Sequence, residues 1–213
     1  DLAVIATTSK IRRAVIENLL AVKNVGALIL EKVLFQTVDD YKVVSSLLSE
    51  KKISCWVNCP RRVQEGYEYL KLILENEKSI SMNVVGNNWG LGCNGIHFVD
   101  LFSFLTGDAN LQLNTELLNK KIIEARRKGF SEVSGTLTGT TTSQHHFNIT
   151  SYKSGISNLQ IQISTPTKRI SIEESGQLKI SVAEEKNDWA ANEKIFPFLF
   201  QSHLTGKLAN EIF

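Results

Sequence analysis

The sequence predicts two parts: a partial doubly wound α/β domain at about residues 1–77, and an α+β domain with a large open antiparallel sheet at about residues 78–213. Three observations support this prediction. Short apolar runs alternate with amphipathic helical patterns in the first part. A segment rich in glycine and asparagine lies near the start of the second part. Beyond it, apolar and polar residues alternate with a period of two over 111–183, as in a sheet with one exposed face.

The apolar runs of the first part predict buried parallel strands. Residues 2–6, 26–30 and 53–57 are short and almost entirely apolar, which fits strands covered on both faces by helices. Ser9 can cap the helix that follows the first run. Strand–helix–strand connections of this kind are right-handed and place the strands parallel in one sheet. The first helix has the apolar stripe Ile11, Val15, Ile16, Leu19 and Leu20.

Two more helices are expected in the first part. Thr37 and Asp40 have capping-box spacing, with Asp in place of Glu, before the second helix. A third helix is expected at about 62–76. The apolar stripes of the two helices are Val43, Val44, Leu47 and Leu48, and Val63, Tyr67, Leu70, Ile73 and Leu74.

The second part begins with a strand pattern at 79–86, which leads into the glycine-rich segment NNWGLGCNG. A helix is expected at about 95–106, where Gly107 fits a C-terminal cap. The last helix is expected at about 190–212. The period-two stretches between these helices include Leu159/Ile161/Ile163, Ile170/Ile172 and Leu178/Ile180/Val182.

Composition excludes several classes of protein. The formal net charge of +2 is too small to indicate nucleic-acid binding, and the basic residues are dispersed. The pair Arg126-Arg127 is interpreted as a solvated surface pair. No apolar run approaches the roughly 20 residues of a membrane span, and no signal peptide is visible. The three cysteines, Cys55, Cys59 and Cys93, show no metal-like pairing. They indicate a reducing cytoplasm.

Residues that could perform chemistry follow two of the predicted strands. Glu31 and Lys32 lie at the carboxyl end of the second strand, where ligands bind in open α/β sheets. A lysine there can shuttle a proton during hydride transfer. The alternative is an exposed ion pair at a strand end. Asn58 and the arginines at 61–62 follow the third strand, where they could meet a phosphate or carboxylate. The alternative there is a helix entry with surface arginines.

The four histidines are interpreted separately. His97 lies in the helix after the glycine-rich segment, and Asp100, three residues later, can share its helix face and orient it. The alternative is a structural histidine. His145 and His146 are neighbours in an apparent strand, so they face opposite sides and are interpreted as sheet-surface residues. His203 is assigned no role.

Four segments together resemble the glucose–fructose oxidoreductase/inositol dehydrogenase family (Gfo/Idh/MocA). They are VIATTS (4–9), GALILEKVLFQT (26–37), WVNCPRR (56–62) and GLGCNGIHFVDLFSFLTG (90–107). Members of this family have a Rossmann domain, an E-K-P motif, an asparagine–arginine motif and a D-x-G-x-H helix start. The resemblance implies a Rossmann-type sheet whose N-terminal part is lacking. No G-x-G-x-x-G turn follows the first strand here, so we expect the pyrophosphate-binding turn to precede these residues.

The resemblance also implies a set of site residues. Lys32 and His97 correspond to the catalytic lysine and histidine of the family. The cofactor, NAD or NADP, would lie along Thr7, Thr8, Ser9, Glu31, Lys32 and Asn58. The substrate would contact Arg61, Trp89, Asn94 and His97.

Two departures from the family pattern concern the chemistry. Val33 replaces the proline of E-K-P, a residue that often allows a cis peptide bond, so the backbone at Lys32 is expected to differ. Cys93 stands where the family has the aspartate of D-x-G-x-H, so the usual aspartate–histidine relay would lack its carboxylate. Asp100 could orient His97 instead.

These features together favour a cytoplasmic NAD(P)-dependent oxidoreductase that acts on a sugar, cyclitol or sugar nucleotide by hydride transfer. The alternative is a non-catalytic relative that binds a ligand or partner. The weakly charged face of the predicted sheet suits a homodimer or homotetramer, as in many members of the family. That face carries Thr138, Thr140, Thr142, Gln144, Gln160 and Gln162.

Overall fold

The computed structural model describes residues 1–125 and 128–212, without the side chains of residues 211 and 212. The predicted surface pair Arg126-Arg127 therefore lies outside the described residues. The chain packs as two compact units, each with its own sheet. The first unit consists of residues 1–59 and the chain from Thr205 onward, and the second unit consists of residues 60–204.

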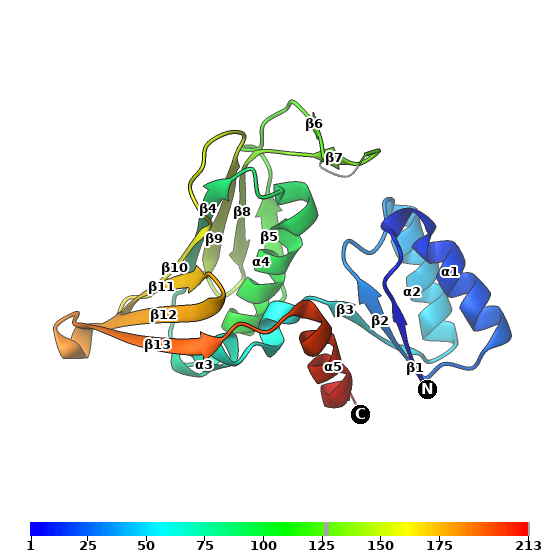
Figure 1. Cartoon of the computed structure of the whole chain (residues 1–213), viewed down its shortest axis with the longest axis horizontal. Helices are drawn as coiled ribbons and strands as arrows, with labels where there is room; N and C mark the ends of the chain where they lie inside the picture. The colour runs from blue at the N-terminus through cyan, green and yellow to red at the C-terminus, as the bar shows by residue number, and fades with distance from the viewer. Residues whose placement is uncertain (126–127, 213) are drawn as a thin grey trace. The chain divides into compact units, whose positions relative to one another are not determined.

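The first unit contains a three-stranded parallel sheet in the order β1-β2-β3 (Figure 1). Helices α1 (Ser9–Val22) and α2 (Val38–Glu50) connect successive strands. Only β2 is buried along its length, with Leu28 and Leu30 in the same core as Ile16 and Leu20. The expected burial of all three strands on both faces is not found, because Val4 of β1 and Val57 of β3 are 51% and 37% exposed. The predicted partial Rossmann-type sheet is nevertheless confirmed. The strands are β1 (Leu2–Ile5), β2 (Ala27–Glu31) and β3 (Ser54–Asn58).

One of the two predicted N-terminal helix caps is present, and Gly107 is the C-cap of the helix before it, as predicted. The Thr37 side chain accepts a hydrogen bond from the Asp40 backbone N–H at 3.2 Å, at the start of α2. At α1 the N-cap is Thr8, which makes no side-chain capping bond. Ser9 is itself the first helical residue, so its hydroxyl lies one position too late to cap the helix.

The second unit contains an eight-stranded sheet in the order β13-β12-β11-β10-β4-β9-β8-β5 (Figure 1). The predicted large open sheet is confirmed, but one pair, β4 with β9, is parallel. A separate two-stranded ladder joins β6 (Ile123–Glu124) to β7 (Ser131–Glu132). The strands of the large sheet are β4 (Ser81–Asn87), β5 (Leu111–Asn114), β8 (Gly135–Thr141), β9 (His146–Tyr152), β10 (Gln160–Ser164), β11 (Lys168–Glu174), β12 (Gln177–Glu184) and β13 (Ala191–Pro197).

Three helical segments cover one face of the large sheet: η1 (Pro60–Val63), α3 (Glu65–Leu74) and α4 (Leu91–Thr106). We expected the first part of the chain to extend to residue 77, but the packed units divide after residue 59. The reason is that the apolar stripe of α3 joins the core of the large sheet. That core includes Tyr67, Leu70, Leu74, Met82, Val84, Phe98, Phe102, Ile161 and Ile180.

The C-terminal segment differs from the predicted single helix at 190–212. Residues 191–197 form β13, which pairs with β12 after the turn η2 (Glu185–Asn187), and only Gln201–Ile212 form a helix, α5. Phe196 stands opposite Leu178 in this ladder and packs against the core. Pro197 would also interrupt a helix, because it has no backbone N–H. Tertiary pairing therefore overrides the helical pattern there.

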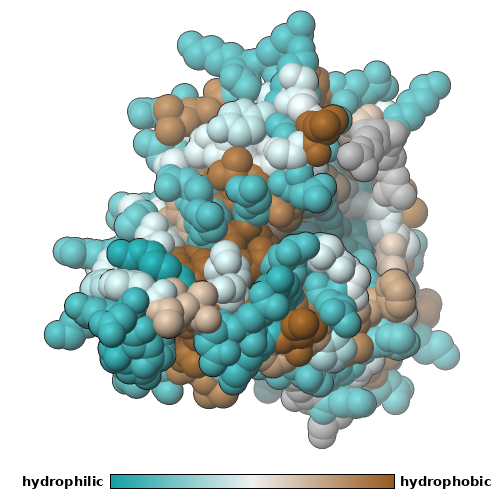
Figure 2. All heavy atoms as spheres, turned by 60° about the vertical axis from the view of Figure 1, so that its left-hand side comes forward, coloured by the Kyte–Doolittle hydropathy of each residue, from teal (hydrophilic) through white to brown (hydrophobic). Residues whose placement is uncertain are grey.

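The exposed face of the large sheet is polar. Thr140, Gln160 and Gln162 are exposed there and alternate with core residues, whereas Thr142 and Gln144 lie in the turn between β8 and β9. Figure 2 shows one side of the molecule, where hydrophilic residues dominate and apolar residues surface in small groups. None of the described helices is long and apolar enough to cross a membrane.

His145 differs from its predicted place on the sheet surface. It lies in the turn before β9 with 7% of its surface exposed. Its Nδ1 accepts a hydrogen bond from the Ile80 backbone N–H at 3.0 Å. This bond explains the burial, because it ties the turn to the start of β4. His146 is exposed, as predicted.

Candidate functional site

In the first unit, the parallel strands place their carboxyl ends at one edge of the sheet. Glu31 stands opposite Asn58 in the β2–β3 ladder. The Asn58 Nδ2 donates to Glu31 Oε2 at 3.0 Å and to Thr205 Oγ1 at 3.2 Å. The sequence predicted Glu31 and Asn58 as neighbours at a strand end, and their side chains do meet. Thr205 was not predicted, because its proximity depends on the return of the chain to this unit.

Two polar atoms at this edge are buried without a hydrogen-bond partner among the described residues. They are Thr7 Oγ1, after β1, and Asn58 Oδ1, after β3. Asn58 is 5% exposed, so water does not readily satisfy its carbonyl oxygen. Buried polar atoms are normally paired. These two atoms therefore suit a polar ligand at the carboxyl ends of the strands, the usual location of ligands in open α/β sheets.

Lys32 directly follows β2 and is half-buried. The Lys32–Val33 peptide bond is cis, although valine replaces the proline of the family motif. Thr8 and Ser9 lie at the start of α1, after the carboxyl end of β1.

Arg12 also lies in this region, although its sequence context predicted no role for it. It is 1% exposed, and its guanidinium donates to the backbone carbonyls of Thr7, Val33 and Leu34. Burial lowers the pKa of Arg12, and the Glu31 carboxylate opposes this shift. One signal could have revealed it: Arg12 precedes Ile16 and Leu20 at intervals of four, on the buried stripe of α1.

In the second unit, the predicted substrate residues Trp89 and Asn94 lie at the start of α4. Trp89 precedes the helix and Asn94 lies in its first turn. Trp89 Nε1 donates to the Thr150 backbone carbonyl at 2.9 Å, and its ring meets Phe98 edge-on with centroids 5.5 Å apart. Asn94 Nδ2 donates to the Trp89 carbonyl at 2.8 Å. These contacts fix the path of the chain from β4 into α4, where Gly90 has a φ of 82°.

The pattern G-x-G-x-x-G was expected to be absent from the whole chain, but it does occur at this turn, in Gly90, Gly92 and Gly95. Here a side chain of the protein already occupies the helix N-terminus. The buried Glu132 carboxylate, from β7, accepts from the Gly92 backbone N–H and from the Cys93 backbone N–H at 3.3 Å. A Cβ at Gly92 would lie 2.7 Å from Glu132 Oε1. The glycines therefore make room for this carboxylate, whose position no sequence pattern predicts.

His97 is half-buried in the second turn of α4. Asp100 binds Arg62. The Arg62 Nε donates to Asp100 Oδ2 at 3.1 Å, and its Nη2 donates to Asp100 Oδ1. Burial raises the pKa of Asp100, and Arg62 opposes the shift. Orientation of His97 by Asp100 was expected from their spacing, and the structure adds an arginine on η1 as a partner of that carboxylate.

Arg61 belongs to a buried network that joins four elements of the second unit. Its Nε and Nη2 donate to Glu174 at 2.9 and 2.7 Å, and the Tyr67 hydroxyl donates to the same carboxylate at 2.6 Å. The guanidinium also lies 4.3 Å from the centroid of the Phe98 ring. Burial lowers the pKa of Arg61 while Glu174 raises it, and the net direction is upward. The charge of Arg61 is thus compensated within the protein.

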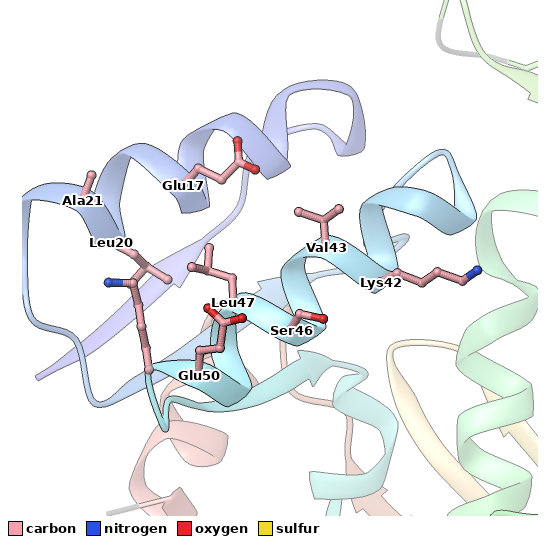
Figure 3. A pocket seen from close by; sticks show the side chains of 9 residues that line it. Glu17, Leu20, Ala21, Lys42, Val43, Ser46, Leu47 and Glu50 are labelled. Atoms are coloured by element: carbon pink, nitrogen blue, oxygen red, sulfur yellow. The ribbon is translucent and has the colours of Figure 1, made fainter.

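A hollow of about 610 Å³ lies between α1 and α2 (Figure 3). Its lining mixes acidic Glu17 and Glu50 with basic Lys42 and Lys51. None of the predicted site residues lines it. Among the described residues, no group of three His, Cys, Asp or Glu side chains is arranged to hold a metal ion.

No protein-family model and no curated protein sequence matches the chain. Solved structures do. They include an Agrobacterium radiobacter oxidoreductase in complex with NAD⁺, L-tartaric acid and magnesium, which is 20% identical with a TM-score of 0.65, over 94% of this chain and 62% of that one. The chain shares the fold of Gfo/Idh/MocA-type oxidoreductases.

Two further matches show the range of proteins with this fold. UDP-N-acetylglucosamine 3-dehydrogenase from Acidithiobacillus ferrooxidans is 12% identical with a TM-score of 0.70, over 98% of this chain and 67% of that one. The transcriptional regulator Gal80p from Kluyveromyces lactis is 15% identical with a TM-score of 0.67, over 97% and 63%. The chain thus spans about 62% of the length of structures such as the Agrobacterium oxidoreductase.

Proposed function

We propose that the protein containing this chain is an NAD(P)-dependent oxidoreductase that acts on a sugar, cyclitol or sugar nucleotide by hydride transfer. The observation that carries this proposal is the edge of the first sheet. There Lys32 follows β2, and two buried oxygens, of Thr7 and Asn58, lie after the neighbouring strands without a partner in the described part of the chain. The fold supports the proposal, because one protein of this fold was solved with NAD⁺. The cytoplasm remains our expected location.

The nicotinamide cofactor, when bound, supplies a hydride donor or acceptor. Asn58 Oδ1 would accept a hydrogen bond from it, and Thr7, Thr8, Ser9 and Glu31 would line its site. These residues fit a polar ligand, because Asn58 has an acceptor that no described residue pairs. Lys32 would carry the substrate proton on its Nζ.

The substrate is assigned to residues of the second unit. His97 would hold or release a proton at its imidazole, as a general acid or base. Trp89 and Asn94 would bound the substrate at the start of α4. Arg61 would contribute to the substrate site indirectly. Its guanidinium lies over the ring of Phe98, the residue after His97.

The test is kinetic. In the complete protein, assayed with NADH or NADPH against a panel of sugars and sugar nucleotides, Lys32→Ala and His97→Ala should each lower kcat by roughly 10²-fold or more. Lys51→Ala is the matched control, because Lys51 is exposed at the end of α2. Near-wild-type rates for Lys32→Ala would rule out its role.

A second function, binding without catalysis, is favoured by two observations. Cys93 replaces the aspartate of the family motif, and the Gal80p regulator has the same fold. Such a relative would bind a nucleotide or sugar ligand without oxidising it. If the complete protein binds NADH but oxidises or reduces none of the sugars and sugar nucleotides, this alternative is correct.

The 213-residue chain alone should bind NADH very weakly. No glycine-rich turn follows β1, and the helix N-terminus at the glycine pattern of Gly90–Gly95 is occupied by Glu132. Backbone amides at such a turn hold the pyrophosphate in dinucleotide-binding folds. Fluorescence titration measures this affinity, and a dissociation constant in the low micromolar range would contradict the expectation.

We also propose self-association through the exposed face of the large sheet, to a homodimer or homotetramer. Exposed side chains that are polar but uncharged support it, among them Thr140, Gln160 and Gln162. A two-fold contact should bury on the order of 1,200–2,000 Å² or more. Sedimentation equilibrium of the 23.8 kDa chain should then show at least twice that mass. A monomer at micromolar concentration would refute this proposal.

A further inference from the structure

Arg12 is a fully buried cation whose hydrogen-bond partners are neutral. It lies on α1, in the first unit, with 1% of its surface exposed. Its Nη1 donates to the backbone carbonyl of Val33 at 2.6 Å and to that of Leu34 at 2.7 Å, and its Nη2 donates to the carbonyl of Thr7. Burying a charge is costly, so a position of this kind needs a reason beyond filling space.

The three carbonyls belong to two different segments at the same edge of the sheet. Thr7 is in the turn that leaves β1, whereas Val33 and Leu34 are the two residues that directly follow Lys32. Each bond has a charged donor and is therefore stronger than an ordinary amide–carbonyl bond. The guanidinium thus connects the turn after β1 to the chain immediately after Lys32, and holds the path of that chain.

The geometry requires arginine. A guanidinium presents its donors in a rigid planar fork, so it can bind carbonyls of two segments at once. A lysine ammonium keeps the charge but lacks this fork. The Glu31 carboxylate favours the cation at a distance, because it raises the pKa of Arg12 against the effect of burial. Arg12 is therefore coupled to Glu31 by charge, and to Lys32 through the carbonyls of the two residues that follow it.

We propose that Arg12 is the positioning residue of Lys32: it sets the backbone after Lys32, and thereby the direction in which the lysine side chain leaves the sheet. The importance of this for turnover rests on the proposed proton-transfer role of Lys32. The positioning itself can be measured without turnover.

The test uses the complete protein with its lysines reductively ¹³C-methylated. The NMR signal of Lys32 is identified by its loss in Lys32→Arg. Arg12→Lys and Arg12→Met should shift this signal and lower kcat by about 10²-fold, with little change in KM for the cofactor, because a misplaced reacting group lowers the rate more than binding. Arg13→Gln is the matched control, since Arg13 is half-exposed on the same helix and binds Glu17 and Asp40.

The outcomes separate the two proposals. A shifted Lys32 signal with an unchanged kcat supports positioning by Arg12 and contradicts the catalytic role of Lys32. An unchanged signal in folded Arg12→Lys overturns the positioning proposal, even if Arg12→Met does not fold. Failure of both Arg12 variants to fold, while Arg13→Gln folds, also overturns it, because Arg12 would then be required for stability alone.

Discussion

The two units each bury an arginine, and they compensate it in opposite ways. Arg12, in the first unit, donates to three neutral carbonyls, whereas Arg61, in the second unit, is held by the Glu174 carboxylate. Burial dominates at Arg12 and its pKa falls, but Glu174 reverses the direction at Arg61. The first arrangement fixes backbone at a strand end. The second fixes side chains of several packed elements to one another.

The difference shows what each unit requires. In the first unit, Arg12 holds two strand-end segments, after β1 and after β2, by their backbone carbonyls rather than by their side chains. In the second unit, η1, α3, α4 and β11 meet through Arg61, Tyr67, Phe98 and Glu174. Loss of one partner there leaves a buried charge, whereas loss of Arg12 leaves neutral groups unpaired. The costs should differ accordingly.

The largest expected effect comes from breaking the second network. Glu174→Gln removes the carboxylate and leaves the Arg61 charge buried, with the two side chains only 18% and 11% exposed. Removal of one partner of a buried ion pair costs roughly 3–5 kcal/mol. We expect a decrease of this size in the free energy of unfolding, measured by urea denaturation.

Glu173→Gln is the control for that change. Glu173 is the preceding residue of β11, is exposed, and accepts a hydrogen bond from the Ser175 hydroxyl. Its effect should be within about 0.5 kcal/mol, as for most surface substitutions. Equal effects of the two substitutions would show that the buried network does not stabilise the second unit.

Tyr67→Phe should produce a smaller loss. It deletes the hydroxyl that donates to Glu174 at 2.6 Å and leaves the ring in the core. Hydrogen bonds to charged groups contribute about 1.5–3 kcal/mol. In a double-mutant cycle with Glu174→Gln the two effects should not add, because both act on one carboxylate. Additive effects would contradict a shared network.

Thr37→Ala tests the first unit near the segment that Arg12 holds. The Thr37 side chain caps α2, a few residues after Val33 and Leu34. Loss of an N-cap costs about 1 kcal/mol. Thermal or urea unfolding should register that loss, with no change in the second unit. Ser9→Ala is the control and should have little effect, because Ser9 follows the N-cap residue of α1.

The smallest expected effect is a dependence on pH. Burial raises the pKa of Asp100 above the ordinary 3.8, so the folded state binds this proton more tightly than the unfolded state. The resulting stabilisation is present below pH 3.8 and is lost as pH rises through the folded-state pKa. Urea titrations of wild type and Asp100→Asn across this window should show wild type losing stability relative to the variant. A relative gain with rising pH would contradict the assignment.

Sequence patterns predicted much of the fold because those signals are local. The runs at 2–6, 26–30 and 53–57 became β1, β2 and β3, but only β2 is buried along its length, because helices do not cover both faces of the outer strands. The period-two stretches became strands of the large sheet. The helical pattern after residue 190 failed, because pairing of β13 with β12 overrode it.

Site residues could be predicted only where a side chain able to bind or transfer a proton directly follows a predicted strand. Glu31, Lys32 and Asn58 could be placed at one edge, because the carboxyl ends of parallel strands lie together. Glu132 and Glu174 could not be placed. They reach Cys93 and Arg61 across 39 and 113 residues of sequence. No local pattern records such a separation.

The sequence by itself determined the alternation of strands and helices in the first part, the presence of a second, larger sheet and the strand-end residues. Tertiary structure alone decided which carboxylates meet which cations, and that α3 belongs with the large sheet. Arg12 shows the reason. Its position on the buried stripe of α1 can be read from spacing, but its carbonyl partners at residues 33 and 34 are brought to it by a crossover connection. Periodicity is a property of neighbouring residues, whereas compensation of a buried charge is a property of the packed chain.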